Sequence, residues 1–353
     1  MPSNFPEARL LVAILAARTE QKCSACPSRR ETIVVGLFRR STWCLSRGRP
    51  QGLPSNGLSL IQKITNMATQ IPQNAPTHQT APTQFVEGNG IRFAYRRFGK
   101  KEGLAFVLIP HILGNLDSWD PSVTDGFAQN REVILFNNAG IASSSGDVPT
   151  TFAEMAKSAG VFIDALGLTK VDVLGFSIGS MIAQNVALQR PDLVRKLVIV
   201  GSGPRNGDGI PLTPESQAIF TNKYGNVDDF WIDGFFTASP ESQAAGRAFL
   251  SRRDARVENR DIPINDKVQP AQFAALQEWG NPIGERFAYL KNIKIPVLVA
   301  GGKSDIIFYT INSFYLEQNL PNAQLIVYPN SAHGSLFQYP ELFVEHVSMF
   351  LRG

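Results

Sequence analysis

Cysteine is scarce in this 353-residue sequence, and the three that occur, Cys23, Cys26 and Cys44, all lie near the N-terminus. The rest of the chain therefore cannot be a disulfide scaffold. Cys23 and Cys26 form a Cys-x-x-Cys pair, but zinc sites usually need a second pair or histidines, and the nearest histidine is His78. We therefore expect no metal site.

Long apolar runs are also absent. No run approaches the roughly 18 residues that a membrane-spanning helix needs, so the sequence predicts no integral membrane segment. The composition, 43% hydrophobic and 18% charged, is typical of a soluble globular protein.

Excess positive charge is confined to one end of the chain. Residues 1–66 hold ten Lys and Arg against three Asp and Glu, whereas residues 67–353 are net negative by three charges. The body of the protein therefore lacks the basic surface that binds nucleic acid, and we expect no nucleic-acid partner.

Residues 1–66 leave several interpretations open. The apolar run Leu10–Ala17 is short for a secretory signal, and Glu7 also opposes one. The many arginines of residues 1–66 suit a mitochondrial presequence, although three glutamates oppose one. A third interpretation is that Met67 is the true start and the upstream residues are an extension from gene prediction. We favour this last interpretation and a cytoplasmic protein; a genuine presequence would place it in mitochondria, and an unassigned tail is the fourth alternative.

The segment from Ala68 to Thr83 has no charges, three prolines and many glutamines and threonines. This composition predicts a disordered lead-in. The expected N-terminal segment therefore covers residues 1–83.

Beyond Thr83, short β-type runs alternate with helical segments. Thr151 to Glu154 has the sequence of a capping box and precedes apolar residues at helical spacing, with Gly167 as a stop signal. The later runs are almost wholly apolar, as in strands buried on both faces of a parallel sheet. This alternation predicts a doubly wound, mostly parallel α/β sheet. The expected strands lie near residues 85–86, 91–95, 105–109, 133–136, 171–174, 197–200, 297–300 and 325–328.

One interval interrupts this alternation. Residues 205–288 have little β signal but many large aromatic side chains, and they are too long for a loop. We interpret them as a helical cap (lid) over the carboxyl edge of the sheet, where such sheets bind ligands. The core then comprises residues 84–204 and 289–353.

A nucleophile motif follows the expected strand at residues 171–174. Gly175-Phe-Ser177-Ile-Gly179 has the Gly-x-Ser-x-Gly pattern of a sharp strand-to-helix turn, which exposes the serine hydroxyl above the helix N-terminus. Glycine is needed on either side of the serine because a Cβ there would clash with the neighbouring helix and strand. Ser177 is therefore the candidate nucleophile.

Serine needs a base, and the chain has only four histidines. His78 lies in the expected lead-in, His111 ends a strand upstream of the serine, and His346 belongs to the apolar face of the last helix. His333 follows the last strand, at the same sheet edge as Ser177. We therefore expect His333 to be the base.

The base in turn needs a carboxylate. Asp305 stands just past the carboxyl end of the expected strand at residues 297–300, again at this edge. The chain order of Ser177, Asp305 and His333 is that of a nucleophile-elbow hydrolase.

With these residues placed, the chain from about Phe85 to its end resembles the α/β-hydrolase fold family, most closely its serine carboxylesterase, lactonase and thioesterase branch. In that family a His-Gly-x-Pro-Gly loop follows the third strand. The sequence Pro110-His111-Ile112-Leu113-Gly114 is similar to this loop, with His111 in place of glycine. The resemblance implies an oxyanion hole formed by the backbone N–H groups of Ile112 and Ile178.

The resemblance also implies a function: two-step acyl transfer that cleaves an ester-type bond of a small, largely apolar molecule, without metal or organic cofactor. The expected substrate pocket includes His111, Phe176, Trp231 and Phe235; His111 is either a substrate-binding or a structural residue, and we favour the structural role. We expect the charge run Arg252–Arg256 to be a solvated helix face rather than a site for an anionic substrate. The oligomeric state and the substrate cannot be read from the sequence.

Other functions remain open on the same fold. Carbon–carbon bond hydrolysis and cofactor-free haloperoxidase activity use the same triad. A ligand receptor, or a partner in a non-hydrolytic biosynthetic reaction, would use the pocket without rapid turnover.

We predict that deleting residues 1–66 leaves folding and activity unchanged, because the expected core begins well beyond them. The measurement is kcat/KM for the full-length and truncated proteins on the same ester. A loss of more than about tenfold, or about 1.4 kcal/mol, would show that these residues contribute to the site.

Overall fold

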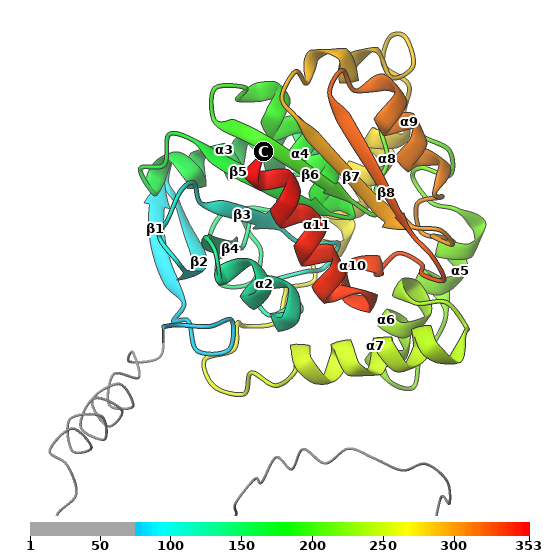
Figure 1. Cartoon of the computed structure of the whole chain (residues 1–353), viewed down its shortest axis with the longest axis horizontal. Coiled ribbons are helices and arrows are strands. Elements are labelled where there is room, and N and C mark those ends of the chain that lie inside the picture. Colours follow the sequence, from blue (N-terminus) through cyan, green and yellow to red (C-terminus); the bar gives the residue numbers. More distant parts are fainter. Residues whose placement is uncertain (1–74) are drawn as a thin grey trace, which may run out of the picture. The chain divides into compact units, whose positions relative to one another are not determined.

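The computed structural model describes residues 75–353, and the three cysteines and the basic segment 1–66 lie outside this range. The described residues contain an eight-stranded sheet with the order β1-β2-β4-β3-β5-β6-β7-β8 (Figure 1). Strand β2 pairs antiparallel with β1 and β4, and every other neighbouring pair is parallel. The predicted mostly parallel α/β sheet is confirmed.

The elements alternate along the chain much as predicted. The strands are β1 (Gln84–Gly88), β2 (Ile91–Gly99), β3 (Phe106–Ile109), β4 (Glu132–Phe136), β5 (Val171–Phe176), β6 (Val194–Val200), β7 (Val297–Gly302) and β8 (Ala323–Tyr328). The helices are α2 (Pro121–Ala128), α3 (Phe152–Ala165), α4 (Ile178–Gln189), α5 (Pro214–Thr221), α6 (Val227–Phe235), α7 (Pro240–Arg253), α8 (Val268–Gly280), the 3-10 helix η1 (Ala288–Asn292), α9 (Ile311–Asn319), α10 (Ser335–Gln338) and α11 (Pro340–Arg352).

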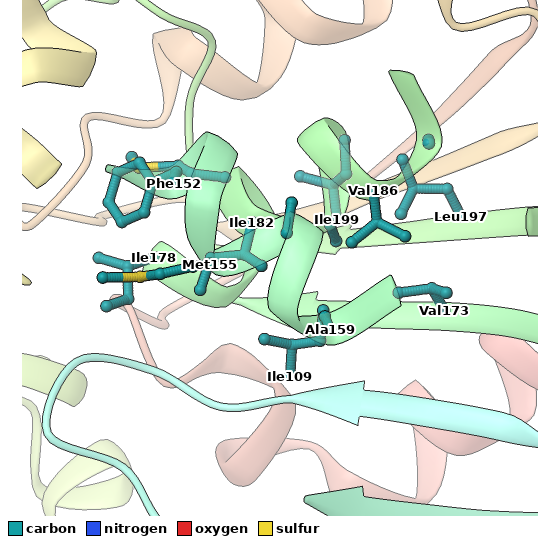
Figure 2. Close-up of a cluster of buried hydrophobic side chains, with 14 of the residues drawn as sticks. Ile109, Phe152, Met155, Ala159, Val173, Ile178, Ile182, Val186, Leu197 and Ile199 are labelled. Carbon is teal, nitrogen blue, oxygen red and sulfur yellow. The ribbon is translucent and has the colours of Figure 1, made fainter. Parts of the chain in front are cut away.

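Helices cover both faces of the sheet, so its central strands are buried on both sides. In β6, Leu197 and Ile199 belong to one core cluster, whereas Val198 and Val200 belong to the other. The first cluster packs against α3 and α4, and Figure 2 shows part of it. The second packs against α2 and α11. This double burial explains why the sequence of these strands is apolar without alternation.

Helix α3 shows how local sequence sets an element's ends. The Thr151 side chain accepts a hydrogen bond from the backbone N–H of Glu154 at 3.2 Å, as the capping box predicts. At the other end Gly167 has a φ of 71°, a conformation that glycine adopts without strain. The helix between them ends at Ala165, one residue before the predicted end.

The interval between β6 and η1 contains helices α5, α6, α7 and α8 and no strand. We call residues 205–288 the cap segment. No helix in residues 75–353 is long and apolar enough to cross a membrane.

The expectation of a disordered lead-in is wrong for residues 75–83; residues 68–74 lie outside the described range. His78 and Ala81 are buried, and the His78 ring lies 2.8 Å from the Thr124 hydroxyl of α2. The order comes from distant side chains: Arg256 donates to the carbonyls of His78, Gln79 and Ala81, at 2.8 to 3.0 Å. A composition-based prediction considers only the segment's own residues and therefore misses such partners.

The expectation that Arg252–Arg256 is a solvated helix face is also wrong. Arg252 forms an ion pair with Asp120 at 2.6 Å, and Arg256 is only 3% exposed. Arg252 bonds to Asp120 at the start of α2, and Arg256 bonds to residues 78–81, so both link the end of α7 to these parts of the chain. They are engaged within the fold and leave little charge free for an anionic substrate.

Burial of His78 predicts an acid-sensitive fold. Burial, with a smaller contribution from nearby Arg96, lowers the pKa of His78 from 6.5 to about 3. Between these pH values the unfolded chain takes up a proton that the folded chain does not, so stability falls as the pH falls below 6.5. We predict that His78→Gln removes about 1.4 kcal/mol per pH unit from the slope of the unfolding free energy between pH 6 and 4.

The measurement is urea unfolding of the wild type and the variant at several pH values. A loss of stability that does not depend on pH shifts the whole plot of unfolding free energy against pH. The slope of this plot therefore still reports the titration of His78. Parallel curves for the two proteins would contradict the prediction.

Candidate active site

Ser177 occupies a strained turn between β5 and α4. Its φ of 60° and ψ of −125° are far from both strand and helix values. The turn ends the strand and begins the helix within one residue, which places the serine at the carboxyl edge of the sheet. The sequence prediction of an elbow at this position agrees with this backbone.

The two glycines that flank the elbow are required by close backbone approach. A Cβ on Gly175 would lie less than 3.0 Å from the backbone of Gly179 and Ser180. A Cβ on Gly179 would lie equally close to the carbonyls of Ile109 and Pro110. Since backbone atoms cannot move aside as a side chain can, these contacts exclude every residue but glycine.

Asp305 and His333 are joined as the sequence predicts. Asp305 Oδ2 lies 2.8 Å from His333 Nδ1, and both side chains are buried. The other carboxylate oxygen accepts from the backbone N–H groups of Ile307 and Phe308, at 2.9 and 3.1 Å. Because the carboxylate accepts, Nδ1 carries the proton and Nε2 has a free lone pair.

Ser177 and His333 line one narrow pocket, here called the aromatic cavity. The other walls are almost wholly apolar. They include Trp231 and Phe235 of the cap segment, which were predicted pocket residues. Phe176 does not line this cavity but packs beneath it, with its ring 5.1 Å from that of His333. The remaining wall residues are Ile112, Ile219, Phe220, Phe230, Gly234 and Ile307.

The backbone N–H groups of Ile112 and Ile178 have no acceptor among residues 75–353, although both residues are buried. Ile178 is the first residue of α4, so its N–H has no partner within the helix. Buried N–H groups without a partner are rare in folded proteins. Two of them beside a candidate nucleophile can bind the oxygen of a developing oxyanion.

His111 occupies the position of the family's glycine and is buried beside this site. Its Nδ1 donates to the carbonyl of Ile112 at 2.8 Å, and its ring meets those of Phe176, Trp231 and Phe235 edge-on. Burial lowers the pKa of His111 to about 4, so the ring is neutral at pH 7. His111 also lines a pocket, so its role stays a prediction.

The other two histidines are engaged elsewhere. The His346 ring contacts the hydroxyl of Tyr328 at 3.0 Å, and His78 packs against α2. No group of three or more metal-ligating side chains occurs in the described range of residues.

Sequence reasoning missed the residues through which the cap segment holds the catalytic loops. Thr213 donates its hydroxyl to the carbonyl of Ile306 at 2.5 Å, next to Asp305. The carbonyl of Phe235 accepts from the N–H of Gly334, next to His333, at 2.8 Å. Thr213 was recognisable as an N-cap residue before Pro214, but no sequence signal reveals its partner across the fold.

A third contact of this kind reaches the oxyanion loop, residues 110–114. Gln272 of α8 accepts from the N–H of Leu113 at 2.8 Å. Leu113 has a φ of 59°, which is unusual for a residue with a Cβ. The loops of Asp305 and His333 and the loop 110–114 are therefore each bound by one cap residue.

Residues 105–340 match the family model described as the alpha/beta hydrolase fold, and this match covers more than half of the chain. The chain belongs to the α/β-hydrolase fold family. The fold that the sequence resemblance implied is thus confirmed.

Two solved structures and one curated protein are similar over most of the chain. An α/β-hydrolase fold protein from Chitinophaga pinensis has 38% identity and a TM-score of 0.74, over 78% of this chain and 99% of its own. Est816, an N-acyl homoserine lactone degrading enzyme, has 28% identity and a TM-score of 0.57, over 76% of this chain and 100% of its own. RutD of Caulobacter sp. (strain K31), assigned as a carbamate hydrolase, is 30% identical over 70% of this chain and 90% of its own.

The close approach at the elbow yields a stability prediction. We expect Gly179→Ala to lower the unfolding free energy by more than about 3 kcal/mol, because its Cβ would collide with backbone carbonyls. The control is Gly160→Ala inside α3, where the new Cβ meets nothing closer than 3.9 Å. That change is expected to stabilise by about 0.5 kcal/mol through helix propensity. Urea unfolding measures both, and equal effects would contradict the proposed constraint.

Proposed function

We propose that this α/β-hydrolase is a serine hydrolase that cleaves ester-type bonds of small, largely apolar substrates through an acyl-enzyme. The observation that carries the proposal is the Asp305–His333 hydrogen bond at the wall of a cavity that Ser177 also lines. These residues are the nucleophile, base and carboxylate of an acyl-transfer site.

In the first step Ser177 attacks the carbonyl carbon of the ester. Nε2 of His333 takes the hydroxyl proton, while Asp305 holds the ring in the required tautomer and stabilises its positive charge. The carbonyl oxygen, now an oxyanion, accepts hydrogen bonds from the N–H groups of Ile112 and Ile178. When the carbon–oxygen bond breaks, the imidazolium of His333 returns the proton to the leaving oxygen.

In the second step water repeats this sequence on the acyl-enzyme. His333 takes a proton from the water, the resulting hydroxide attacks the acyl carbon, and the imidazolium protonates Ser177 as the acid departs. The backbone donors serve both steps because each passes through the same kind of tetrahedral oxyanion. The chemistry uses this chain's side chains, backbone N–H groups and water.

The aromatic cavity supports an apolar substrate group beside the base. Trp231 and Phe235 bring large apolar surfaces next to His333. Exclusion of water there strengthens the hydrogen bonds to the oxyanion. The lactone activity of Est816 and the carbamate assignment of RutD support including lactones and carbamates beside carboxylesters and thioesters, since all present an electrophilic carbonyl.

We predict one covalent adduct when the protein reacts with a fluorophosphonate, because this probe captures an activated serine as a tetrahedral adduct. Intact-mass spectrometry of the wild type and Ser177→Ala, side by side, measures it. The expected result is a single stoichiometric adduct on the wild type and none on the variant.

A panel of esters, lactones, thioesters and carbamates then identifies the bond that is cleaved. An adduct on both proteins would show that another residue reacts, and no adduct on either would contradict the nucleophile assignment. A ligand receptor on this fold would bind its ligand equally well after Ser177→Ala and show no turnover.

A further inference from the structure

A second enclosed cavity, here called the inner cavity, lies behind the oxyanion loop. It is narrow: its free space, about 20 Å³ for the centre of a water-sized sphere, holds about one water molecule. Its walls are mostly apolar and include Ile141 after β4, Met155 of α3 and Ile178 of α4. Figure 2 shows Met155 and Ile178 next to one another on the face of the sheet that α3 and α4 cover. His111 and Gln272 complete the wall nearest the cap segment.

The two cavities meet at the candidate oxyanion hole. Ile112 and Ser177 line the aromatic cavity, whereas their neighbours His111 and Ile178 line the inner cavity. The peptide units between these neighbours therefore lie in the partition, and they carry the two N–H groups proposed to bind the oxyanion. An ester carbonyl held by these donors has its two substituents pointing away from its oxygen, one toward each cavity.

The position of the base assigns the two halves of the ester. His333 lines the aromatic cavity and not the inner one. Because His333 must protonate the leaving oxygen, the alcohol half lies on its side, in the aromatic cavity. The acyl half of the ester then lies in the inner cavity.

Gln272 gives the inner cavity a polar preference. The N–H of Leu113 can only donate, so the side-chain atom that faces it must be the amide oxygen. The amide nitrogen, Nε2, then remains as a donor, and it has no acceptor among residues 75–353 although the side chain is only 5% exposed. Among the other polar side chains of the wall, Asn138 bonds to the backbone of Met155 and Ala139, and Nδ1 of His111 bonds within its own loop.

We propose that the inner cavity binds the acyl half of the substrate and that Gln272 selects acyl groups carrying a hydrogen-bond acceptor, such as an ether, keto or amide oxygen. The Nε2 donor has no acceptor within the described residues, so an acceptor on the acyl chain would gain a hydrogen bond from it. The same side chain holds the oxyanion loop through Leu113, so it couples acyl recognition to the oxyanion donor of Ile112. This inference rests on the proposed esterase activity and adds the substrate class.

The first experiment distinguishes the two cavities with two series of esters. Ethyl acetate and ethyl hexanoate differ in the acyl half, whereas ethyl acetate and hexyl acetate differ in the alcohol half. Val148→Phe narrows the inner cavity from a half-buried position, and Gly234→Leu narrows the aromatic cavity, where a Cβ meets nothing closer than 3.9 Å.

We expect Val148→Phe to lower the ratio of kcat/KM for ethyl hexanoate to that for ethyl acetate by about tenfold or more. Gly234→Leu should instead lower the ratio for hexyl acetate to ethyl acetate. The reverse pattern, or equal loss of both ratios in both variants, would overturn the assignment. If Val148→Phe does not fold, Met155→Phe fills the same cavity from α3.

The second experiment tests Gln272 with isosteric acyl groups. Ethyl ethoxyacetate and ethyl 3-methoxypropanoate replace one methylene of ethyl pentanoate by an ether oxygen. After correction for rates of alkaline hydrolysis, we expect the wild type to prefer at least one ether over pentanoate by about threefold to tenfold, the value of one hydrogen bond.

Two variants separate the two roles of Gln272. Gln272→Glu keeps an acceptor for Leu113 but, when ionised, has no donor, and Gln272→Leu removes both. Both should abolish the ether preference, and only Gln272→Leu should also slow fluorophosphonate labelling. Absence of the preference in the wild type, or its persistence in Gln272→Leu, would overturn the role of Gln272.

Labelling of the wild type separates this inference from the proposed function. If the wild type neither labels nor hydrolyses any ester, the proposed function fails and this inference fails with it. If the wild type labels and turns over esters but none of the ratios shifts, the proposed function stands and the subsite assignment alone is wrong.

Discussion

The site depends on one steric constraint, the contact between backbones at the nucleophile elbow. Strand β5 and helix α4 can meet within a single residue only because Gly175 and Gly179 have no Cβ. Ser180 stabilises the turn, since its hydroxyl donates to the carbonyl of Gly175 at 2.5 Å and accepts from the N–H of Val200 at 3.0 Å. The turn therefore links β5, α4 and β6. It leaves the N–H of Ile178 unpaired at the helix start, where it can serve as a donor.

The cap segment lines the aromatic cavity and also holds loops of the candidate site. Thr213, Phe235 and Gln272 each make one hydrogen bond to a different loop of the site, at 2.5 to 2.8 Å. The bonds of Thr213 and Gln272 are partly buried, so water competes with them less than with a surface contact. A displacement of the cap would consequently disturb the acid, base and oxyanion loops together. The ring of Phe235 also packs against that of His333, so a displacement of the cap would move the His333 ring as well.

The sequence predicts best what depends on local patterns. The strands of the sheet follow from apolar runs, and the elbow at Ser177 from the spacing of two glycines. The chain order of Asp305 and His333 placed them at one sheet edge, where their hydrogen bond is found. The contacts that the sequence did not predict join residues far apart in the chain. Arg256 orders residues 78–81 across more than 170 positions, and Gln272 reaches Leu113 across 159.

Two imidazoles in one small site raise the question of which one takes the proton. His111 and His333 both pack against Phe176 and Phe235, so a charge on either ring disfavours a charge on the other. The two rings differ in the group that faces each of them. The His333 ring faces a carboxylate, whereas Nδ1 of His111 faces only the neutral carbonyl of Ile112.

Burial without a counter-charge holds the pKa of His111 near 4, which keeps this ring neutral over the range in which the proposed base must work. His111 therefore adds no positive charge beside the proposed base. The histidine that replaces the family's glycine is therefore compatible with catalysis because the aromatic side chains around it exclude water and prevent its ionisation.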